Sequence, residues 1–411
     1  VGLSMFSVSQ NGADFAVFST SYRYYGLVDV SSIWPRKGSV SGSTMLTVTG
    51  SGFENTTSLT CSFGNENHTY TNATFISGSQ LVCMSPPSES TGSVFVEVSV
   101  NGADYTSDMT VYEYIKEAHM VSVYPESGPT TGGTIVLLTG NGFVDGDSLR
   151  CRFGDEVVAG RWISSEQVEC VSPPHEPGII PIELSLNEVD FTSYLLVFEY
   201  YTDATVFSLD PSFGPSIGGT EVTVTGDNFI VADVLQCRFG MRVAAAVYVS
   251  PSMIVCESPP GDVGLSMFSV SQNGADFAVF STSYRYYGLV DVSSIWPRKG
   301  SVSGSTMLTV TGSGFENTTS LTCSFGNENH TYTNATFISG SQLVCMSPPS
   351  ESTGSVFVEV SVNGADYTSD MTVYEYIKEA HMVSVYPESG PTTGGTIVLL
   401  TGNGFVDGDS L

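Results

Sequence analysis

Hydrophobic and polar residues alternate along most of the chain in short runs, separated by turns rich in Gly, Pro, Asn and Ser. Alternation with a period of two places every second side chain on the same face of a β-strand. In the run 44–50, for example, Leu46 and Val48 share the face expected to point inward, and runs 134–140 and 220–226 follow the same pattern. Turn signals every 8–12 residues are typical of β-sandwiches. The pattern therefore predicts an all-β chain without helices.

Asn-Gly pairs stand between strand-like runs at Asn11-Gly12 and Asn101-Gly102. A two-residue type I′ turn needs positive φ at both of its central residues, which Asn and Gly tolerate best. We therefore expect a type I′ hairpin at each pair.

The sequence repeats at two scales. Residues 1–149 are identical to residues 263–411 at every position, an offset of 262 residues. Within this unit, a second period of 86–90 residues separates the motif Cys-x-Phe-Gly at Cys61, Cys151 and Cys237, and Cys-x-Ser-Pro-Pro follows each time. Perfect identity indicates a recent, homogenised duplication or one unit repeated along a polymer. Either origin predicts a long array of similar domains.

These periods divide the chain into four complete domains and two partial ones. The expected segments are the C-terminal part of a domain at 1–26, domain 1 at 27–116, domain 2 at 117–203, domain 3 at 204–288, domain 1 repeated at 289–378, and the N-terminal part of domain 2 repeated at 379–411. We interpret the chain as a window in a continuing array. The alternative is that half-domains pair between chains by strand exchange.

Five motifs follow one another along the repeat: Pro-x-x-Gly, Gly-Gly-Thr-x-Val-x-Val-Thr-Gly, Cys-x-Phe-Gly, Cys-x-Ser-Pro-Pro and Val-x-Val-Ser-x-Asn-Gly. Combined, these motifs resemble the IPT/TIG family of immunoglobulin-like domains. The resemblance covers essentially the whole chain. It implies tandem β-sandwiches of the kind shared by plexins, growth-factor receptors, fibrocystin-like proteins and some transcription factors, and it says little about activity. The acidic charge and the paired cysteines resemble the extracellular branch of the family.

Charge and hydropathy narrow the expected partners. The chain has 42 acidic and 13 basic side chains, a formal net charge of −29. Nucleic acids and anionic membrane surfaces bind through Lys and Arg, so neither is expected as a partner. The longest apolar runs are about seven residues, far short of the ~20 that span a bilayer, so no membrane span is expected. The expected partners are the continuing repeat chain, identical protomers and covalent glycans.

The eight cysteines occur as one local pair in each complete domain. This spacing predicts four disulfides: Cys61–Cys83, Cys151–Cys170, Cys237–Cys256 and Cys323–Cys345. Pairs of reduced core thiols are the alternative. Zinc is disfavoured because no regular histidine accompanies each pair. Disulfides imply an oxidising compartment and therefore an extracellular protein.

Asn-x-Thr sequons occur in only one of the three domain types. They lie at Asn55, Asn67 and Asn72, with copies at Asn317, Asn329 and Asn334. In a secreted eukaryotic chain such sites accept N-linked glycans. Chance alone predicts about as many sequons, so the prediction rests on their placement in polar loops and a Thr-rich edge. Ordinary polar loop residues are the alternative.

No arrangement of residues predicts catalysis, a cofactor or a resident metal. The run 214–218 reads Gly-x-Ser-x-Gly, but a nucleophile elbow needs a preceding strand and a following helix, so we interpret it as a turn. Three histidines lack ligand spacing: His68, His119 and His175. Asp145 and Asp147 lie in a Gly-rich loop without the EF-hand pattern. Weak calcium binding there is the alternative to a solvated turn.

Residues 114–120 run from a closing strand into the next opening strand without a Gly- or Ser-rich linker. A short connection limits hinge motion and predicts a stiff, extended rod. Near such a junction, Trp34 is expected either to pack on Tyr24 or Tyr25 of the preceding domain or to lie in its own core.

Two apolar residues of domain 2, Ile135 and Leu137, are expected on the outward face of their strand, where domain 3 carries Glu221 and Thr223. An exposed apolar pair forms a lateral contact or is covered by a loop.

The leading functional hypothesis is the structural subunit of an extracellular glycosylated filament without catalysis. The alternative is the stalk or binding region of a cell-surface receptor or adhesin. An accessory β-domain of a carbohydrate-active enzyme is third, and it requires a catalytic domain elsewhere.

Overall fold

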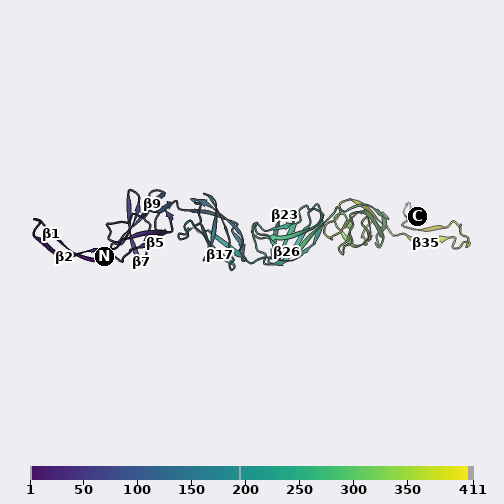
Figure 1. Ribbon diagram of the computed structural model, residues 1–411. Coiled ribbons are helices and arrows are strands. Elements are labelled where there is room, and N and C mark those ends of the chain that lie inside the picture. The colour runs from purple at the N-terminus through teal and green to yellow at the C-terminus, as the bar shows by residue number, and fades with distance from the viewer. Residues whose placement is uncertain (1, 194–195, 406–411) are drawn as a thin grey trace. The chain divides into compact units, whose positions relative to one another are not determined.

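The computed structural model describes residues 2–193 and 196–405, which form β-strands joined by turns and contain no helix (Figure 1). The prediction of an all-β chain is confirmed. No helix in these ranges is therefore long and apolar enough to cross a membrane. The chain forms two units, Val1–Thr202 and Asp203–Leu411. Each unit contains two sandwiches and one terminal hairpin.

Each sandwich has eight strands in the same spatial order, which in the first is β3-β5-β8-β7-β6-β9-β10-β4. Its strands are β3 (Asp29–Trp34), β4 (Lys37–Ser39), β5 (Met45–Ser51), β6 (Thr60–Gly64), β7 (His68–Ser77), β8 (Gln80–Met84), β9 (Gly92–Ser99) and β10 (Thr110–Ile115). The first half of β7 pairs with β6 and the second half with β8, so this one strand joins the two layers. All the pairs are antiparallel except that of β4 with β10.

The other three sandwiches repeat this order. The second contains β11 (His119–Tyr124), β12 (Ser127–Pro129), β13 (Ile135–Asn141), β14 (Arg150–Phe153), β15 (Glu156–Ser164), β16 (Gln167–Val171), β17 (Gly178–Ser185) and β18 (Val197–Tyr201). The third contains β19 (Thr205–Asp210), β20 (Phe213–Pro215), β21 (Glu221–Asp227), β22 (Gln236–Phe239), β23 (Arg242–Ser250), β24 (Met253–Glu257), β25 (Gly264–Ser271) and β26 (Ala278–Tyr287). The fourth contains β27 (Asp291–Trp296), β28 (Lys299–Ser301), β29 (Met307–Ser313), β30 (Thr322–Gly326), β31 (Thr331–Ser339), β32 (Gln342–Met346), β33 (Gly354–Ser361) and β34 (Thr372–Ile377).

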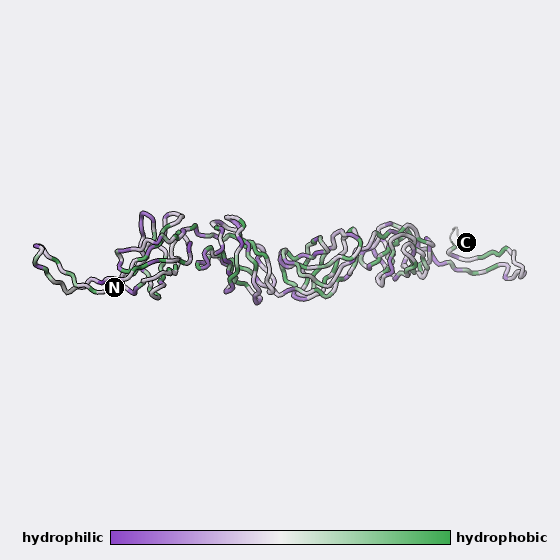
Figure 2. The backbone as a smooth tube through the Cα atoms, in the orientation of Figure 1, coloured by the Kyte–Doolittle hydropathy of each residue, from purple (hydrophilic) through white to green (hydrophobic). Residues whose placement is uncertain are grey.

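Alternation along the strands decides which residues form each core. On β5, Leu46 and Val48 are fully buried, whereas Met45 is exposed. Figure 2 shows the corresponding change between hydrophobic and hydrophilic residues along the chain. Each sandwich has its own core of buried aliphatic and aromatic side chains around its cysteines. Each domain therefore carries its own hydrophobic stabilisation.

The two terminal hairpins have the strand pairing of a complete sandwich but not the burial of its side chains. The hairpin of β1 (Gly2–Ser9) and β2 (Phe15–Tyr24) has the register of β25 and β26, with Gly2 opposite Tyr24 as Gly264 is opposite Tyr286. Phe6 is nevertheless 56% exposed, whereas its copy Phe268 is fully buried. At the other end, β35 (His381–Tyr386) pairs with β36 (Leu399–Asn403) in the same way as β11 pairs with β13. The local sequence therefore specifies the hairpin, and the remaining strands of a sandwich bury its side chains.

All four predicted disulfides are present: Cys61–Cys83, Cys151–Cys170, Cys237–Cys256 and Cys323–Cys345. The first joins β6 to β8 and thus ties together two strands that are separated by β7 in the sheet order. All the cysteines are buried.

The prediction of type I′ turns is wrong. Gly102 has a φ of 75°, but Asn101 is not among the residues with positive φ, and the strands that flank the pair end at Ser99 and resume at Thr110. The Asn101 side chain accepts hydrogen bonds from the backbone N–H groups of Ala103 and Asp104. An Asx turn of this kind replaces the tight hairpin because the side-chain oxygen takes the place of a backbone carbonyl.

The outer sheet faces carry apolar residues on domains 1 and 2. Ile135 is 60% exposed and Leu137 is half-buried, so the expected outward orientation is confirmed and no loop covers Ile135. Trp34 is 52% exposed on β3, so its placement in a core is wrong. The aromatic pairs among the described residues do not join it to Tyr24 or Tyr25 either.

A tyrosine of the closing strand holds the Ser-Pro-Pro segment in every sandwich. The hydroxyl of Tyr200 donates to the carbonyl of Pro173 at 2.7 Å, and Tyr286 bonds Pro259 in the same way. Burial raises the pKa of Tyr200 and of Tyr286 to about 12. The phenols are therefore neutral hydrogen-bond donors in the folded chain at neutral pH.

Reduction of the disulfides is expected to destabilise each complete sandwich. Opening a loop of 19 or 22 residues costs about 3 kcal/mol in the chain-entropy description. Calorimetry of the chain with and without reductant measures the effect as a lower Tm of each domain transition. Reduced and oxidised chains that unfold at the same temperature would contradict the prediction.

Alkaline pH is expected to unfold the sandwiches through the buried tyrosines. The unfolded phenols ionise near pH 10.0, whereas folded Tyr200 and Tyr286 do so at about 12. Their raised pKa values stabilise the fold below pH 10 and lose this contribution as the pH rises through about 12. Denaturant titrations at a series of pH values should show the free energy of unfolding falling across this interval. A free energy that stays level there would rule out the assignment.

Candidate functional site at the domain junctions

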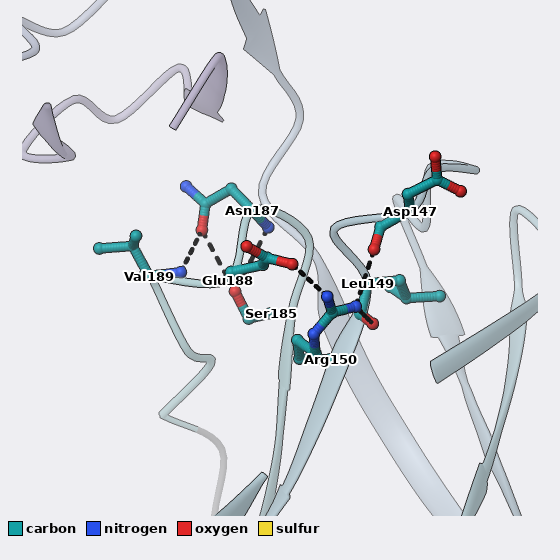
Figure 3. Close-up of polar contacts among 7 residues, drawn as sticks. All are labelled: Asp147, Leu149, Arg150, Ser185, Asn187, Glu188 and Val189. Atoms are coloured by element: carbon teal, nitrogen blue, oxygen red, sulfur yellow. Dashed lines mark hydrogen bonds and ion pairs between the residues drawn. The ribbon is translucent and has the colours of Figure 1, made fainter. Parts of the chain in front are cut away.

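The loop that follows β17 is a network of polar contacts outside the cores. Its sequence is Ser-x-Asn-x-x-Asp, and Asn187 Oδ1 accepts the N–H groups of Val189 at 3.1 Å and Asp190 at 2.8 Å. The hydroxyl of Ser185 donates to the same oxygen (Figure 3). Asn187 Nδ2 donates to the carboxylate of Asp190 at 2.8 Å. The two side chains are thus fixed by the loop itself before any other domain is considered.

Arg150 supports this loop from the start of β14. Its guanidinium donates to the carbonyls of Asp147 at 2.7 Å and Leu149 at 2.9 Å and forms an ion pair with Glu188 (Figure 3). Glu188 has a φ of 73°, a left-handed conformation that glycine adopts at the same position in the other domains, as at Gly102. The ion pair with Arg150 helps to hold the non-glycine residue in this conformation.

In the first unit, the loop of domain 2 is bonded to domain 1. The hydroxyl of Thr44 donates to Asp190 Oδ2 at 2.6 Å, and Asn187 Nδ2 donates to the carbonyl of Lys37 at 3.0 Å. Thr44 is fully buried and Asn187 nearly so. We call these four residues and their counterparts the interdomain clamp. A bond from a hydroxyl to an ionised carboxylate is stronger than one between neutral groups, especially where water is excluded.

A glycine under the clamp allows its close packing. A Cβ atom on Gly38 would lie 2.1 Å from the Tyr112 hydroxyl and 2.3 Å from Thr44 Oγ1. Burial raises the pKa of Tyr112, which therefore stays neutral beside the carboxylate of Asp190. Only glycine fits between the tyrosine and the threonine, which explains the Gly in the Pro-x-x-Gly motif.

The second unit contains the same clamp between domain 3 and the repeated domain 1. The hydroxyl of Thr220 donates to Asp366 at 2.7 Å, and Asn363 donates to the carbonyl of Phe213 at 2.9 Å. Here Tyr287 is also buried and packs with the core of the repeated domain 1, and burial raises its pKa.

An ion pair adds to this junction. Arg285 and Glu316 lie 2.8 Å apart, and the same two residues occur as Arg23 and Glu54 in the first unit, also at 2.8 Å. The guanidinium of Arg285 lies 4.9 Å from the ring centroid of Phe213. Both groups of the ion pair are partly exposed, so it contributes less than the buried clamp.

Identical residues in the repeated domains differ in solvent exposure, depending on whether a neighbouring domain covers them. Asn363 is 6% exposed in the clamp, whereas its copy Asn101 is exposed. Thr44 is fully buried, whereas its copy Thr306 is only half-buried. Burial of the clamp is therefore a property of the domain junction, since the sequences are the same.

The connection between β10 and β11 is short and packed. Only residues 116–118 separate the two strands, and Ala118 is buried. Glu117 accepts a hydrogen bond from Ser41 at 3.4 Å. This arrangement combines a three-residue connection with a hydrogen-bonded clamp, which limits the relative motion of domains 1 and 2.

The residues of the clamp were missed by the sequence analysis, which interpreted Asn-Gly as a turn signal alone. A usable signal was present. An Asp follows three residues after the Asn in all copies, at Asp14, Asp104, Asp190, Asp276 and Asp366, whereas the Gly is replaced by Glu188 in domain 2. A turn alone does not require this Asp.

The six predicted glycosylation sites are all exposed: Asn55, Asn67, Asn72, Asn317, Asn329 and Asn334. Asn55 lies in the loop after β5, Asn67 in the turn between β6 and β7, and Asn72 on β7. Exposure makes the side chains accessible to a glycosyltransferase. Their modification stays a prediction.

The residues considered for chemistry do not come together. Ser216 lies in the turn between β20 and β21, as expected from the sequence. His68 bonds Ser62 and His175 stacks on Tyr200, in different domains. The carbonyl of Asp147 accepts a hydrogen bond from Arg150. Within the described part of the chain, no group of three or more His, Cys, Asp or Glu is placed to hold a metal ion.

The profile described as IPT/TIG domain matches residues 29–114, 118–200, 204–286 and 291–376. Fibrocystin-L of Homo sapiens is 30% identical over 306 residues, which cover 70% of this chain and 7% of that protein. Plexin A3 of Danio rerio is 30% identical over 214 residues, which cover 49% of this chain and 11% of that protein. A structure of the plexin A4 full extracellular region covers 89% of this chain and 40% of its own, with 15% identity and a TM-score of 0.35.

Replacing Thr44 by Val is expected to loosen the junction between domains 1 and 2. The change keeps the shape of the side chain and removes the donor to Asp190, a bond to a charged group worth about 1.5–3 kcal/mol. Fluorescence energy transfer between dyes on the two domains should report a broader distance distribution.

Thr306→Val is the matched control, because Thr306 has the same local neighbours but faces no Asn-x-x-Asp loop in the described residues. With dyes on domain 3 and the repeated domain 1, its distance distribution should equal that of the unchanged chain. Broadening there as large as that caused by Thr44→Val between domains 1 and 2 would show that the threonine acts within its own domain rather than through the clamp.

Proposed function

Because the chain belongs to the IPT/TIG family and contains four tandem copies of its domain, we propose that it is the structural subunit of an extracellular, glycosylated filament. The observation that carries the proposal is the identity of residues 1–149 and 263–411. Ligand recognition does not require a perfect repeat, whereas a filament gains equivalent junctions along its length.

The interdomain clamp supports this function. It occurs in both units with the same residue types, Thr and Asp, although the flanking domains differ in sequence. Each domain has its own core and disulfide, so load or damage in one sandwich leaves the cores of the others intact. The disulfides also favour an extracellular location.

Charge supports the same interpretation. One unit of 262 residues contains 9 basic and 29 acidic side chains, a formal net charge of −20. Like charge on neighbouring filaments keeps them apart at low ionic strength. Sugars on the six exposed sequons would add hydration and protection from proteases. We propose no catalytic role and no resident cofactor.

The stalk of a cell-surface receptor or adhesin is the second candidate. It is favoured by the similarity to fibrocystin-L and plexins, of which the chain spans only 7% to 11%. A stalk needs only a limited number of domains, and the sequence identity between its repeats has no function there.

Electron cryomicroscopy of the native, glycosylated material tests the proposal. We expect a continuous fibre with an axial repeat on the order of 100 Å, the span of three immunoglobulin-like domains. Extra density should extend from Asn55, Asn67 and Asn72. Discrete particles with a finite string of domains would exclude the filament and favour the stalk. A fibre with bare asparagines would keep the scaffold and remove the glycan coat.

A further inference from the structure

An aromatic surface lies beside one of the predicted glycosylation sites. On the outer face of β7, Tyr70 is 57% exposed, and its ring centroid lies 5.3 Å from that of Tyr105. The ring of His68 also stacks with Tyr70, with the ring centroids 6.4 Å apart. Tyr70 therefore contacts two other rings on domain 1. We call Tyr70 and Tyr105 the aromatic platform.

Asn72 adjoins the platform by strand geometry. Residues two apart on a strand share a face, so Asn72 lies on the same side of β7 as Tyr70. The cross-strand partner of Asn72 is Thr60, and the Thr60 hydroxyl is hydrogen-bonded to the Tyr105 hydroxyl at 3.0 Å. The amide of Asn72 is therefore flanked by one ring along its own strand and by the other across the sheet.

In domains 2 and 3, the aromatic ring at the position of Tyr105 is covered by an arginine of the same domain. The guanidinium of Arg152 lies 4.2 Å from the ring centroid of Phe191, and Arg238 covers Phe277 at the same distance. Both arginines stand at the position of Ser62 in domain 1, directly after the first cysteine. Domain 1 therefore lacks the guanidinium, carries an additional exposed tyrosine, and alone contains sequons.

We propose that the first N-acetylglucosamine of an N-linked glycan on Asn72 packs against the aromatic platform. Aromatic faces carry partial negative charge, and they attract the weakly positive C–H groups of a pyranose ring in the way that they attract a cation. The sugar takes the place that arginine has in the other domains. The repeated domain has the same site at Asn334, with Tyr332 and Tyr367 at 5.3 Å. This inference rests on the proposed glycosylation but not on the filament.

The other two sequons have no exposed aromatic residue two positions before the Asn. The residue two positions before Asn55 is Phe53, which is buried in the core. The residue two positions before Asn67 is Asn65, whose side chain donates to the carbonyl of Ser93. A glycan on Asn72 is therefore held against the protein, whereas glycans on Asn55 and Asn67 extend into solvent.

A double-mutant cycle on the whole 411-residue chain, secreted from a eukaryotic host, tests the proposal. One change removes the platform by Tyr70→Thr with Tyr332→Thr, and the other removes the glycan by Asn72→Gln with Asn334→Gln. Loss of the glycan should lower the Tm of the domain 1 transition by about 2–4 °C when the tyrosines are present and by nearly nothing when they are absent.

Ile76→Thr with Ile338→Thr is the matched control, since these residues are similarly exposed on the same strands. The glycan should raise the Tm of this control as much as that of the unchanged chain. An equal effect of the glycan in the tyrosine and threonine backgrounds would overturn the proposal. Glycopeptide mass spectrometry that finds Asn72 bare would also overturn it.

A direct measurement covers the case in which the threonine variant does not fold. In chains that carry isotope-labelled N-acetylglucosamine, ring currents of the platform should shift the proton resonances of one sugar upfield. Resonances that all match those of a solvated sugar would exclude the contact. Neither measurement requires the chain to form fibres. Evidence against the filament and evidence against the contact between the sugar and the aromatic platform can therefore be told apart.

Discussion

The hydrogen bond from a buried threonine to the aspartate of the following domain is the interaction on which the domain arrangement within each unit depends. The donor, Thr44 or Thr220, is fully buried only because the next domain covers it. A buried hydroxyl without a partner is costly, so the Asn-x-x-Asp loop that covers the threonine must also supply an acceptor, which is its Asp. The loop is rigid before docking because its own Asn fixes the Asp, which reduces the entropy lost at the junction.

The sequence predicts the fold well and the junction poorly, for physical reasons. Strands, core positions such as Leu46 and the disulfide pairs follow from local alternation and from paired spacing. The junction depends on residues 146 positions apart, as Thr44 is from Asp190, and no local pattern connects them. The turn at Asn101 was assigned to the wrong class because the amide side chain competes with the backbone for the same N–H groups.

The comparison of identical residues in different surroundings separates three levels of organisation. Phe6 and Phe268 have the same neighbours in sequence and the same strand pairing, but only Phe268 is buried. The same holds one level higher for Asn101 and Asn363, which form the same loop and differ in the domain beside them. Hairpins are therefore specified locally, sandwiches by the whole domain, and clamps by pairs of domains.

The two clamps, one within each unit, have the same direction. In both, the preceding domain supplies the threonine and the backbone carbonyl, and the following domain supplies the Asn and the Asp. A ribosome releases the N-terminal domain first. Each Asn-x-x-Asp loop therefore emerges when the preceding domain, to which it will bind, is already folded. Each clamped pair of domains is therefore polar in the sense used for cytoskeletal polymers: the two sides of a break at its junction expose different chemistry, and two identical sides cannot rejoin.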